Sequence, residues 1–274
     1  MWSTAKFNID RNSRGRIMEI REISKDKLKV KVYKTRPEMG TDAADEVAGR
    51  INSMLETRDY INIVFASAPS QNEFLISLRE QDVDWGRINA FHMDEYVGLD
   101  GAAPQLFGNF LKEIMFNHVT CKEVYYLNGD KNNLEQECKR YSDLMRDYPT
   151  DIVILGIGEN THLAFNDPHV AFFDDPELVK IVDLDEKNRQ QQVDPDDHIC
   201  FKTIEEVPTH AITLTIPVLF KATYAYAIAP GKNKADAIYH TLTDDIQEKY
   251  PSTILRNHPN AILYIDEDSA SQLG

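Results

Sequence analysis

Short, nearly continuous apolar runs alternate along the chain with longer stretches in which apolar residues recur every three or four positions. A run such as "DIVIL", at residues 151–155, has the composition that a strand needs when both faces of a parallel sheet are covered. We therefore predict strands at residues 29–33, 61–67, 88–93, 151–158, 211–216, 224–229 and 261–266.

The longer stretches place Ala, Leu, Ile, Met and Phe at helical spacing. They predict helices at residues 38–58, 71–81, 104–117, 132–147 and 232–242. Because strands and helices alternate, the expected fold class is α/β. The predicted architecture is a doubly wound, largely parallel sheet in a three-layer α/β/α sandwich of the Rossmann-like type.

The first part of the chain differs from the rest. Residues 1–27 are polar and charged with little periodicity, so we expect them to form a loosely held N-terminal extension. Residues 28–274 should form a single α/β domain, since no repeat, low-complexity tract or clear linker interrupts them.

The charge of the chain argues against anionic partners. Its 30 Lys and Arg residues are outnumbered by 45 Asp and Glu residues, which gives a net charge of −15 at pH 7. Such a charge repels nucleic acids and anionic membrane surfaces. The densest basic stretch, residues 25–34, alternates charged with apolar residues and is interpreted as the polar face of a strand. We therefore expect no nucleic-acid partner and no membrane partner.

Cysteine usage and the N-terminal sequence both favour the cytoplasm. Cys121, Cys138 and Cys200 form no C-x-x-C pair, so neither a disulfide framework nor a zinc ribbon is predicted. The N-terminus lacks the apolar core of a signal peptide, and no segment approaches the roughly 18 apolar residues needed to span a bilayer. We expect a cytoplasmic protein.

The carboxyl ends of the predicted strands are where a ligand should bind, because loops diverge there and helix N-termini present free N–H groups. The stretch "HMDEYVGLD" places Asp94 and Glu95 at such an end, followed by Tyr96. An isolated acidic pair usually lies in a solvated turn. The alternative is that one carboxylate faces the cleft, where apolar walls raise its pKa and suit it to act as a base.

A second strand end carries a histidine. In "GIGENTHLAFNDP", the backbone of Gly156 and Gly158 permits close approach to His162. Asn160 and Asp167 can reach the imidazole and fix its tautomer, as orienting groups do in general acid–base sites. A lone histidine is more often a surface or core residue, and the G-x-G pattern lacks the spacing of a dinucleotide fingerprint.

Two further strand ends offer groups that suit a phosphate. "FASAPSQ" provides the Ser67 and Ser70 hydroxyls and backbone N–H groups at the start of a helix, although Ser70 could be a plain N-cap. "APGKNKA" provides Lys232 and Lys234, whose ammonium groups could bind a phosphate or lie in solvent. In a chain this acidic, the two together favour a phosphate site.

The motifs at these strand ends together resemble those of a known family. "INAFHMDEYVGL", "GIGENTHLAFNDP", "PGKNKA" and the late "PSTILRNHP" closely resemble the glucosamine-6-phosphate deaminase/isomerase family, a relative of the 6-phosphogluconolactonases, from about residue 38 to the end of the chain. The resemblance implies that an amino-sugar phosphate opens and moves a proton between C2 and C1. The resulting imine is then hydrolysed to fructose 6-phosphate and ammonia. No metal and no organic cofactor is implied.

The resemblance also implies roles for individual residues. By position, Asp94 matches the family's proton-shuttling carboxylate, His162 its ring-opening acid–base and Lys234 its phosphate lysine. One flexible base can move a proton between neighbouring carbons, and opening a hemiacetal needs a donor near the ring oxygen. The expected catalytic residues are Asp94, Tyr96, Asn160, His162 and Asp167. The expected substrate-binding residues are Ser67, Ala68, Ser70, Gly158, Arg189 and Lys234.

The sequence departs from the family pattern around the histidine. Asn160 and Thr161 replace the usual Asp-Gly before His162, and Asp167 replaces a glutamate. Asn160 can hold the imidazole by a hydrogen bond but cannot stabilise its cation by charge. Thr161 should need a backbone conformation that glycine adopts more easily.

The phosphate loop departs from the pattern as well. Ser67-Ala68-Pro69-Ser70 replaces Thr-Gly-Gly-Thr, which keeps the hydroxyls and stiffens the loop. Arg189, in "EKNRQQQV", lies a few residues from the expected place of the family's phosphate arginine and is taken as its substitute.

Two rival functions are left by the sequence. The first is a lactonase, or an isomerase of another sugar phosphate, in which His162 activates water. "MDEY" favours deamination over this rival, because lactone hydrolysis needs no base for a C2 proton. The second rival is a non-catalytic sugar-phosphate sensor, suggested by Asn160 and Thr161. The hexosamine epimer and a homo-oligomeric state are left open.

Overall fold

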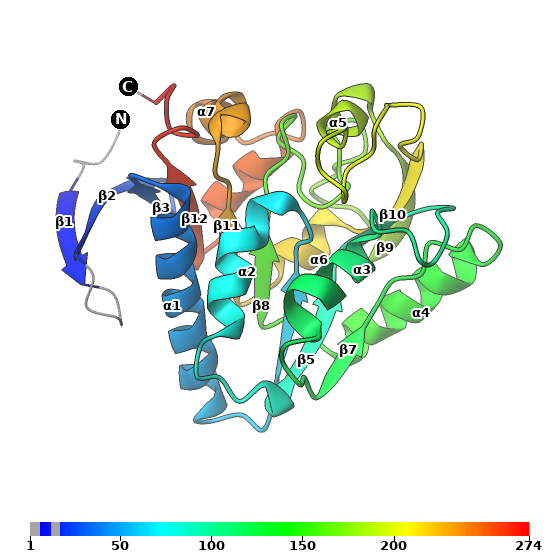
Figure 1. Ribbon diagram of the computed structural model, residues 1–274, viewed down its shortest axis with the longest axis horizontal. Coiled ribbons are helices and arrows are strands. Elements are labelled where there is room, and N and C mark those ends of the chain that lie inside the picture. The colour runs from blue at the N-terminus through cyan, green and yellow to red at the C-terminus, as the bar shows by residue number, and fades with distance from the viewer. Residues whose placement is uncertain (1–5, 12–16, 274) are drawn as a thin grey trace.

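A nine-stranded sheet lies between two layers of helices in the computed structural model, which describes residues 6–11 and 17–273 (Figure 1). The strand order is β1-β2-β3-β12-β11-β8-β4-β5-β7, and every pairing from β3 to β7 is parallel. The parallel strands are β3 (Leu28–Tyr33), β4 (Ile61–Phe65), β5 (Ile88–His92), β7 (Glu123–Tyr125), β8 (Ile152–Leu155), β11 (Tyr224–Ile228) and β12 (Ala261–Asp266).

Both faces of this sheet are covered, so alternate residues of one strand enter two different cores. In β8, Ile152 and Ile154 pack into one core, and Val153 and Leu155 into the other. Helices α1 (Arg36–Leu55), α2 (Asn72–Arg79) and α3 (Phe107–Leu111) cover the first face. Helices α4 (Leu134–Asp147), α6 (Ile216–Phe220) and α7 (Ala235–Thr243) cover the second. This arrangement confirms the predicted doubly wound α/β fold.

The helices begin and end where local chemistry permits. Helix α1 begins after Thr35, whose hydroxyl accepts from the Glu38 N–H, and Pro37 lies in its first turn, where its missing N–H costs nothing. The helix predicted at 104–117 is shorter and irregular, since α3 passes directly into a π-helical turn, η3 (Lys112–Phe116). Short 3₁₀ helices occur at η1 (Pro69–Gln71), η2 (Trp85–Arg87), η4 (Lys232–Lys234) and η5 (Pro251–Asn257).

A second, antiparallel sheet lies beyond the carboxyl end of β5. It contains β6 (Asp94–Tyr96), β10 (His210–Leu214) and β9 (Val179–Asp183), and β9 is followed by the short helix α5 (Glu186–Gln191). The strand predicted at 211–216 is therefore β10, but it belongs to this small sheet and not to the parallel one. The strands β6 and β9 were not predicted, because charged residues interrupt their apolar pattern.

The N-terminal segment is more ordered than its sequence suggested. Strands β1 (Lys6–Arg11) and β2 (Ile17–Lys25) extend the main sheet antiparallel to β3. Ile20 packs into one core and Ile23 into the other. The prediction of a loosely held extension is therefore wrong for these residues. Charged residues surround the apolar positions in the sequence, so the strand pattern could not be recognised. Residues 1–5 and 12–16 lie outside the described residues, and the domain boundary at residue 28 stays a prediction.

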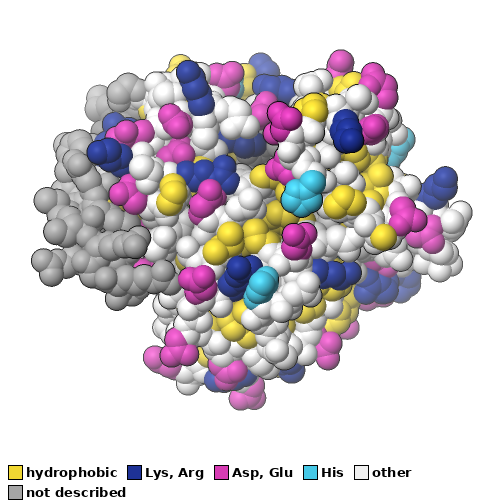
Figure 2. All heavy atoms as spheres, viewed as in Figure 1, with side chains coloured by type: hydrophobic (Ala, Val, Ile, Leu, Met, Phe, Trp, Pro, Cys, Tyr) yellow, Lys and Arg dark blue, Asp and Glu magenta, His cyan; other side chains and the backbone are white. Residues whose placement is uncertain are grey.

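The surface carries charges of both signs. On the face drawn in Figure 2, acidic and basic side chains are interspersed, and hydrophobic side chains line a shallow central depression. Within the described ranges, no helix combines the length and the apolar character required to cross a membrane.

Candidate active site

One pocket opens at the carboxyl ends of the central strands and brings together most of the predicted site residues. The loops after β4, β5 and β8 and the helix η4 after β11 contribute to it. Its lining includes Ser67, Ala68, Ser70, Asp94, Gly158, His162 and Lys234, with Met93, Phe107, Phe165, Gln191 and Gln192 completing the wall. The fold therefore brings these seven predicted residues together in one pocket.

The Asp94 carboxyl belongs to the lining of the pocket. It follows β5 directly, in the first position of β6, and only 5% of the residue is exposed. Burial, and to a lesser extent the neighbouring Glu95 carboxylate, raise the pKa of Asp94 well above its usual range. A carboxyl in this setting holds a proton more readily than an exposed one, which suits a group that takes up and returns a proton.

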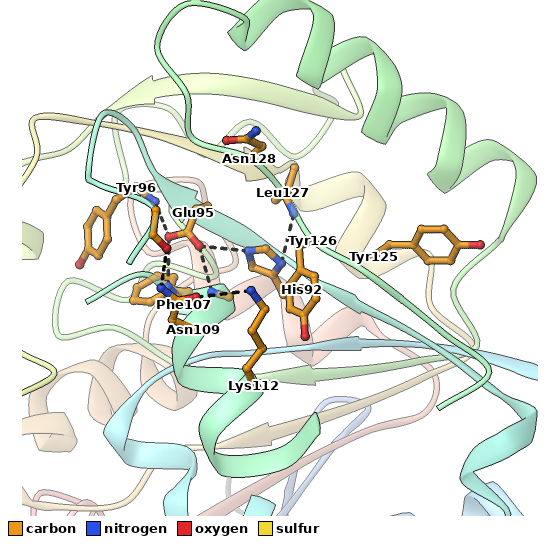
Figure 3. A network of polar contacts seen from close by, with 12 residues as sticks. His92, Glu95, Tyr96, Phe107, Asn109, Lys112, Tyr125, Tyr126, Leu127 and Asn128 are labelled. Carbon is orange, nitrogen blue, oxygen red and sulfur yellow. Dashed lines mark hydrogen bonds and ion pairs between the residues drawn. The ribbon is translucent and has the colours of Figure 1, made fainter. Parts of the chain in front are cut away.

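Glu95 has a different task from Asp94. Its carboxylate accepts hydrogen bonds from the Phe107 and Gly108 N–H groups at 3.0 and 2.9 Å, so it caps the start of α3 (Figure 3). His92 Nε2 lies 3.5 Å from the same carboxylate, while His92 Nδ1 accepts from the Leu127 N–H at 3.3 Å. The acidic pair is thus divided: Asp94 faces the pocket, and Glu95 anchors the backbone beside it.

His162 lies directly against the backbone of Gly158. A β-carbon at Gly158 would come within 2.1 Å of the imidazole ring, so only glycine leaves room for the ring in this position. Thr161 adopts a φ of +72°, the left-handed conformation that was expected to favour glycine. The loop therefore has a backbone conformation at residue 161 that threonine disfavours.

The imidazole is oriented by both residues that the sequence suggested. His162 Nδ1 lies 2.6 Å from Asn160 Oδ1 and 3.2 Å from Asp167 Oδ1. Asp167 does not line the pocket, but its buried carboxylate also accepts from the Asn188 side chain at 2.8 Å. Burial alone would raise the pKa of Asp167, but the hydrogen bond and charge of His162, with further hydrogen bonds, lower it overall.

Strand β10 connects the histidine loop to the segment that carries Asp94. Thr213 pairs with Asp94 in the register of the small sheet, and its hydroxyl accepts from the Phe165 N–H at 3.1 Å. The Asn166 side chain donates to the Leu214 carbonyl at 2.8 Å. The "AFN" part of the motif therefore fastens the histidine loop to β10.

Three further side chains of the pocket, at Ser67, Ser70 and Lys234, offer groups for an anion. The Ser67 hydroxyl is buried and has no hydrogen-bond partner among the described residues. Ser70 accepts from the Gln71 side chain at 3.1 Å. Burial lowers the pKa of Lys234 to about 8, although the nearby Glu159 carboxylate opposes that shift. An anion placed here would stabilise the charged ammonium and satisfy the Ser67 hydroxyl.

A second cavity of about 360 Å³ adjoins the pocket at Ser70 and Lys234. It shares Ala68, Ser70 and Lys234 with the pocket and adds Arg36 and Asn233. The Arg36 guanidinium donates from Nε to the Glu73 carboxylate at 2.6 Å and also to the Pro69 carbonyl. The guanidinium therefore braces the loop that carries the two serines.

Four predicted residues do not line the pocket. Asn160 and Asp167 contact the His162 ring, whereas Arg189 and Tyr96 have contacts elsewhere. Arg189 donates to the carbonyls of Ile204 and Val207 at 2.6 and 3.0 Å, so its guanidinium holds the loop that contains these two residues. The Tyr96 ring packs between Phe107 and Phe165, with centroid distances of 4.9 and 5.1 Å. Neither side chain is among those that line the pocket.

Sequence reasoning missed other residues of the site. Gln191 and Gln192, which follow Arg189 closely in the sequence, line the pocket. Their position in the polar run after Arg189 was visible, but nothing local indicates which side of a short helix faces a ligand. Within the described residues, no cluster of three or more His, Cys, Asp or Glu side chains is arranged to hold a metal ion.

Comparisons with known proteins agree with this geometry. Residues 34–264 match the family described as "Glucosamine-6-phosphate isomerases/6-phosphogluconolactonase". A glucosamine-6-phosphate deaminase of Bacillus cereus (strain B4264) is 34% identical over 221 residues, which cover 81% of each chain. The solved structure of a monomeric glucosamine-6-phosphate deaminase has a TM-score of 0.79 at 27% identity and covers 88% of this chain and 98% of its own.

The fold extends to more distant structures. A 6-phosphogluconolactonase of Trypanosoma brucei has a TM-score of 0.73 at 16% identity, covering 89% of this chain and 98% of its own. At that identity the likeness concerns the fold alone. The match over residues 34–264 and the 34% identity to the B. cereus enzyme concern the family as well as the fold. Together with the resemblance of the motifs at the strand ends, they show that the chain belongs to the glucosamine-6-phosphate isomerase/6-phosphogluconolactonase family.

Proposed function

We propose that the protein is an amino-sugar-phosphate deaminase/isomerase that converts glucosamine 6-phosphate, or a close epimer, into a ketose phosphate and ammonia. The observation that carries the proposal is one pocket that contains a buried carboxyl at Asp94, an oriented imidazole at His162 and a buried cation at Lys234. The names of the B. cereus relative and of the monomeric structure, both glucosamine-6-phosphate deaminases, support the same activity.

His162 supplies the acid–base for ring opening. Its Nδ1 faces Asn160 and Asp167, so Nε2 is the nitrogen left for the substrate. Nε2 accepts the proton of the C1 hydroxyl, and the imidazolium then returns a proton to the ring oxygen as the ring opens. The Asp167 carboxylate, whose pKa is lowered, compensates for the neutral Asn160 by stabilising this cation through space.

Asp94 moves the proton between carbons. Its ionised form removes the C2 proton from the open-chain aldehyde while O1 takes up a proton from solvent, which leaves a neutral enolamine. The protonated carboxyl then delivers its proton to C1, which creates a protonated imine at C2. Water adds to that imine and ammonia leaves, so the product is a ketose phosphate. The raised pKa of Asp94 supports the return step, because the carboxyl holds its proton until C1 receives it.

Lys234 and the serine hydroxyls bind the phosphate in this proposal. Lys234 lies with Ser67 and Ser70 on one side of the pocket, and Asp94 and His162 line the rest. A phosphate bound there anchors the sugar at C6, and its charge keeps the ammonium protonated.

A lactonase is the alternative function. The structures of 6-phosphogluconolactonases share the fold. Hydrolysis of a lactone, however, requires no carboxyl to remove a C2 proton. The buried Asp94 carboxyl in the pocket therefore favours deamination over this alternative.

Product analysis on a small substrate panel tests the proposal. Ammonia and ketose phosphate are measured with glucosamine 6-phosphate, galactosamine 6-phosphate and 6-phosphogluconolactone, and unphosphorylated glucosamine is the matched control. Equal amounts of ammonia and ketose phosphate from a hexosamine phosphate are expected. Lactone hydrolysis without ammonia would favour the lactonase. Binding of the sugar phosphates without turnover of any of them would favour the sensor.

A further inference from the structure

Asp185 lies at the start of α5 and does not line the pocket. One of its carboxylate oxygens caps α5 by accepting from the Asn188 N–H at 2.7 Å. The other accepts from the Asn160 side chain, also at 2.7 Å. Its backbone N–H donates to the Asp167 carboxylate at 3.0 Å. Asp185 therefore contacts both residues that orient His162.

These contacts determine which way the Asn160 amide points. Its nitrogen lies 2.7 Å from the Asp185 carboxylate and 2.9 Å from the Asp167 carboxylate. An ionised carboxylate only accepts hydrogen bonds, so the amide NH₂ must face these two groups. The amide oxygen is then directed at the histidine.

The orientation of the amide in turn determines the tautomer of the imidazole. Asn160 Oδ1 lies 2.6 Å from His162 Nδ1 and 3.2 Å from the His162 backbone N–H. An amide oxygen can only accept, so Nδ1 must carry a proton. In the neutral ring, Nε2 then has a free lone pair.

We propose that Asp185 is a positioning residue for His162: it holds the Asn160 amide in one orientation, keeps the imidazole proton on Nδ1 and leaves Nε2 able to accept a proton in the pocket. The use of Nε2 in ring opening rests on the proposed function, whereas the tautomer is a property of the free protein. The arrangement also explains why an asparagine suits position 160. A carboxylate there would meet two other carboxylates at the place where the amide donates to both.

Substitution of Asp185 separates this role from a general loss of structure. In Asp185→Asn, the single amide oxygen can serve α5 or Asn160 but not both, and in Asp185→Ala both contacts are lost. Asp183→Asn is the matched control, because Asp183 lies two residues earlier on β9, is exposed and pairs with the exposed His169 at 3.0 Å. Thermal unfolding of all variants checks that they fold.

The main readout is the two-bond ¹⁵N–¹H spectrum of His162 in the unliganded protein, which reports the nitrogen that carries the proton. The parent and Asp183→Asn should show the Nδ1–H tautomer, and both Asp185 variants should show a mixture. Turnover of glucosamine 6-phosphate should fall about 10-fold or more in the Asp185 variants with KM little changed. The loss should stay below the roughly 10⁴-fold seen when the orienting aspartate of a serine protease is replaced, because Asp167 remains.

Exchange of the two side chains gives a second, independent test. Asn160→Asp alone should lower turnover more than either Asp185 variant, since it brings three carboxylates together. The double variant Asn160→Asp/Asp185→Asn restores an amide donor and an acceptor, so it should recover most of the lost turnover and the Nδ1–H tautomer.

Two results would overturn the positioning role. One is an Asp185→Asn spectrum that matches the parent at parental turnover, and the other is a double variant no better than Asn160→Asp. If Asp185→Asn fails to fold, the tautomer and the turnover of Asp185→Ala and of the double variant test the positioning role instead. A protein that shows the expected tautomers but turns over no hexosamine phosphate would sink the proposed function and leave the positioning role standing.

Discussion

The contact between Gly158 and the His162 ring makes Gly158→Ala a direct test of the site. An added β-carbon would lie 2.1 to 2.3 Å from three ring atoms, whereas ordinary contacts begin near 3.4 Å. The ring must therefore move by about 1 Å, a misplacement that can cost roughly 10²-fold in rate. The 2.6 Å contact between Nδ1 and Asn160 is lost in the same movement. We expect the kcat for ammonia release to fall about 10²-fold.

The assay needs to show that only the histidine end of the pocket has changed. Inorganic phosphate, used as a competitive inhibitor, should bind Gly158→Ala as tightly as the parent, because Ser67 and Lys234 are untouched. Gly49→Ala is the control: nothing lies within 4 Å of its added β-carbon in α1. That change should raise the free energy of unfolding by about 0.5 to 1 kcal/mol without altering turnover. Parental turnover by folded Gly158→Ala would refute the assigned position of the ring.

Three further predictions follow from the site and its loop. His162→Ala should lower kcat by about 10² to 10⁴-fold, as expected for a lost acid–base, with phosphate binding retained; an unchanged kcat would make the histidine structural. The pKa of Lys234 is lowered to about 8, so the ammonium is lost as pH rises through that value, and KM should increase above it. Lys234→Met should raise KM and remove this pH dependence, and a dependence that persists would assign it to another group. Thr161→Gly should raise the free energy of unfolding by about 1 kcal/mol in urea titrations, because it relieves a left-handed φ of +72° and removes a buried hydroxyl that has no partner among the described residues. A decrease would mean that packing of the threonine outweighs both effects.

The parallel sheet could be predicted because its strands are buried on both faces, which makes each apolar run continuous. Strand β6 could not, since it contains Asp94 and Glu95 within three residues. The burial of Glu95 depends on the N–H groups of Phe107 and Gly108, which lie far along the chain. Such a contact leaves no periodic signal in the sequence.

The site likewise contains features that the sequence predicts and features that depend on distant contacts. The meeting of Asp94, His162 and Lys234 in one pocket could be predicted, because each follows a recognisable strand and strand ends of a parallel sheet meet, whereas their roles stay predictions. Arg189 was placed wrongly, because the direction of a side chain on a six-residue helix depends on how that helix packs. The role of Asp185 was not predictable, since it requires Asn160 and Asp167 to approach it through the fold.

Strand β10 holds Asp94 and the His162 loop together, whereas Ser67 and Lys234 extend from strands of the main sheet. All four groups follow strands of the main sheet, but the two proposed to move protons are also joined through the small sheet. For a substrate held by its phosphate, the packing between the two sheets then sets the distance from the phosphate to Asp94. That distance determines how many carbons can separate the phosphate from the reacting carbons. A chain one carbon shorter would bind by the same phosphate contacts and present the wrong carbon to Asp94.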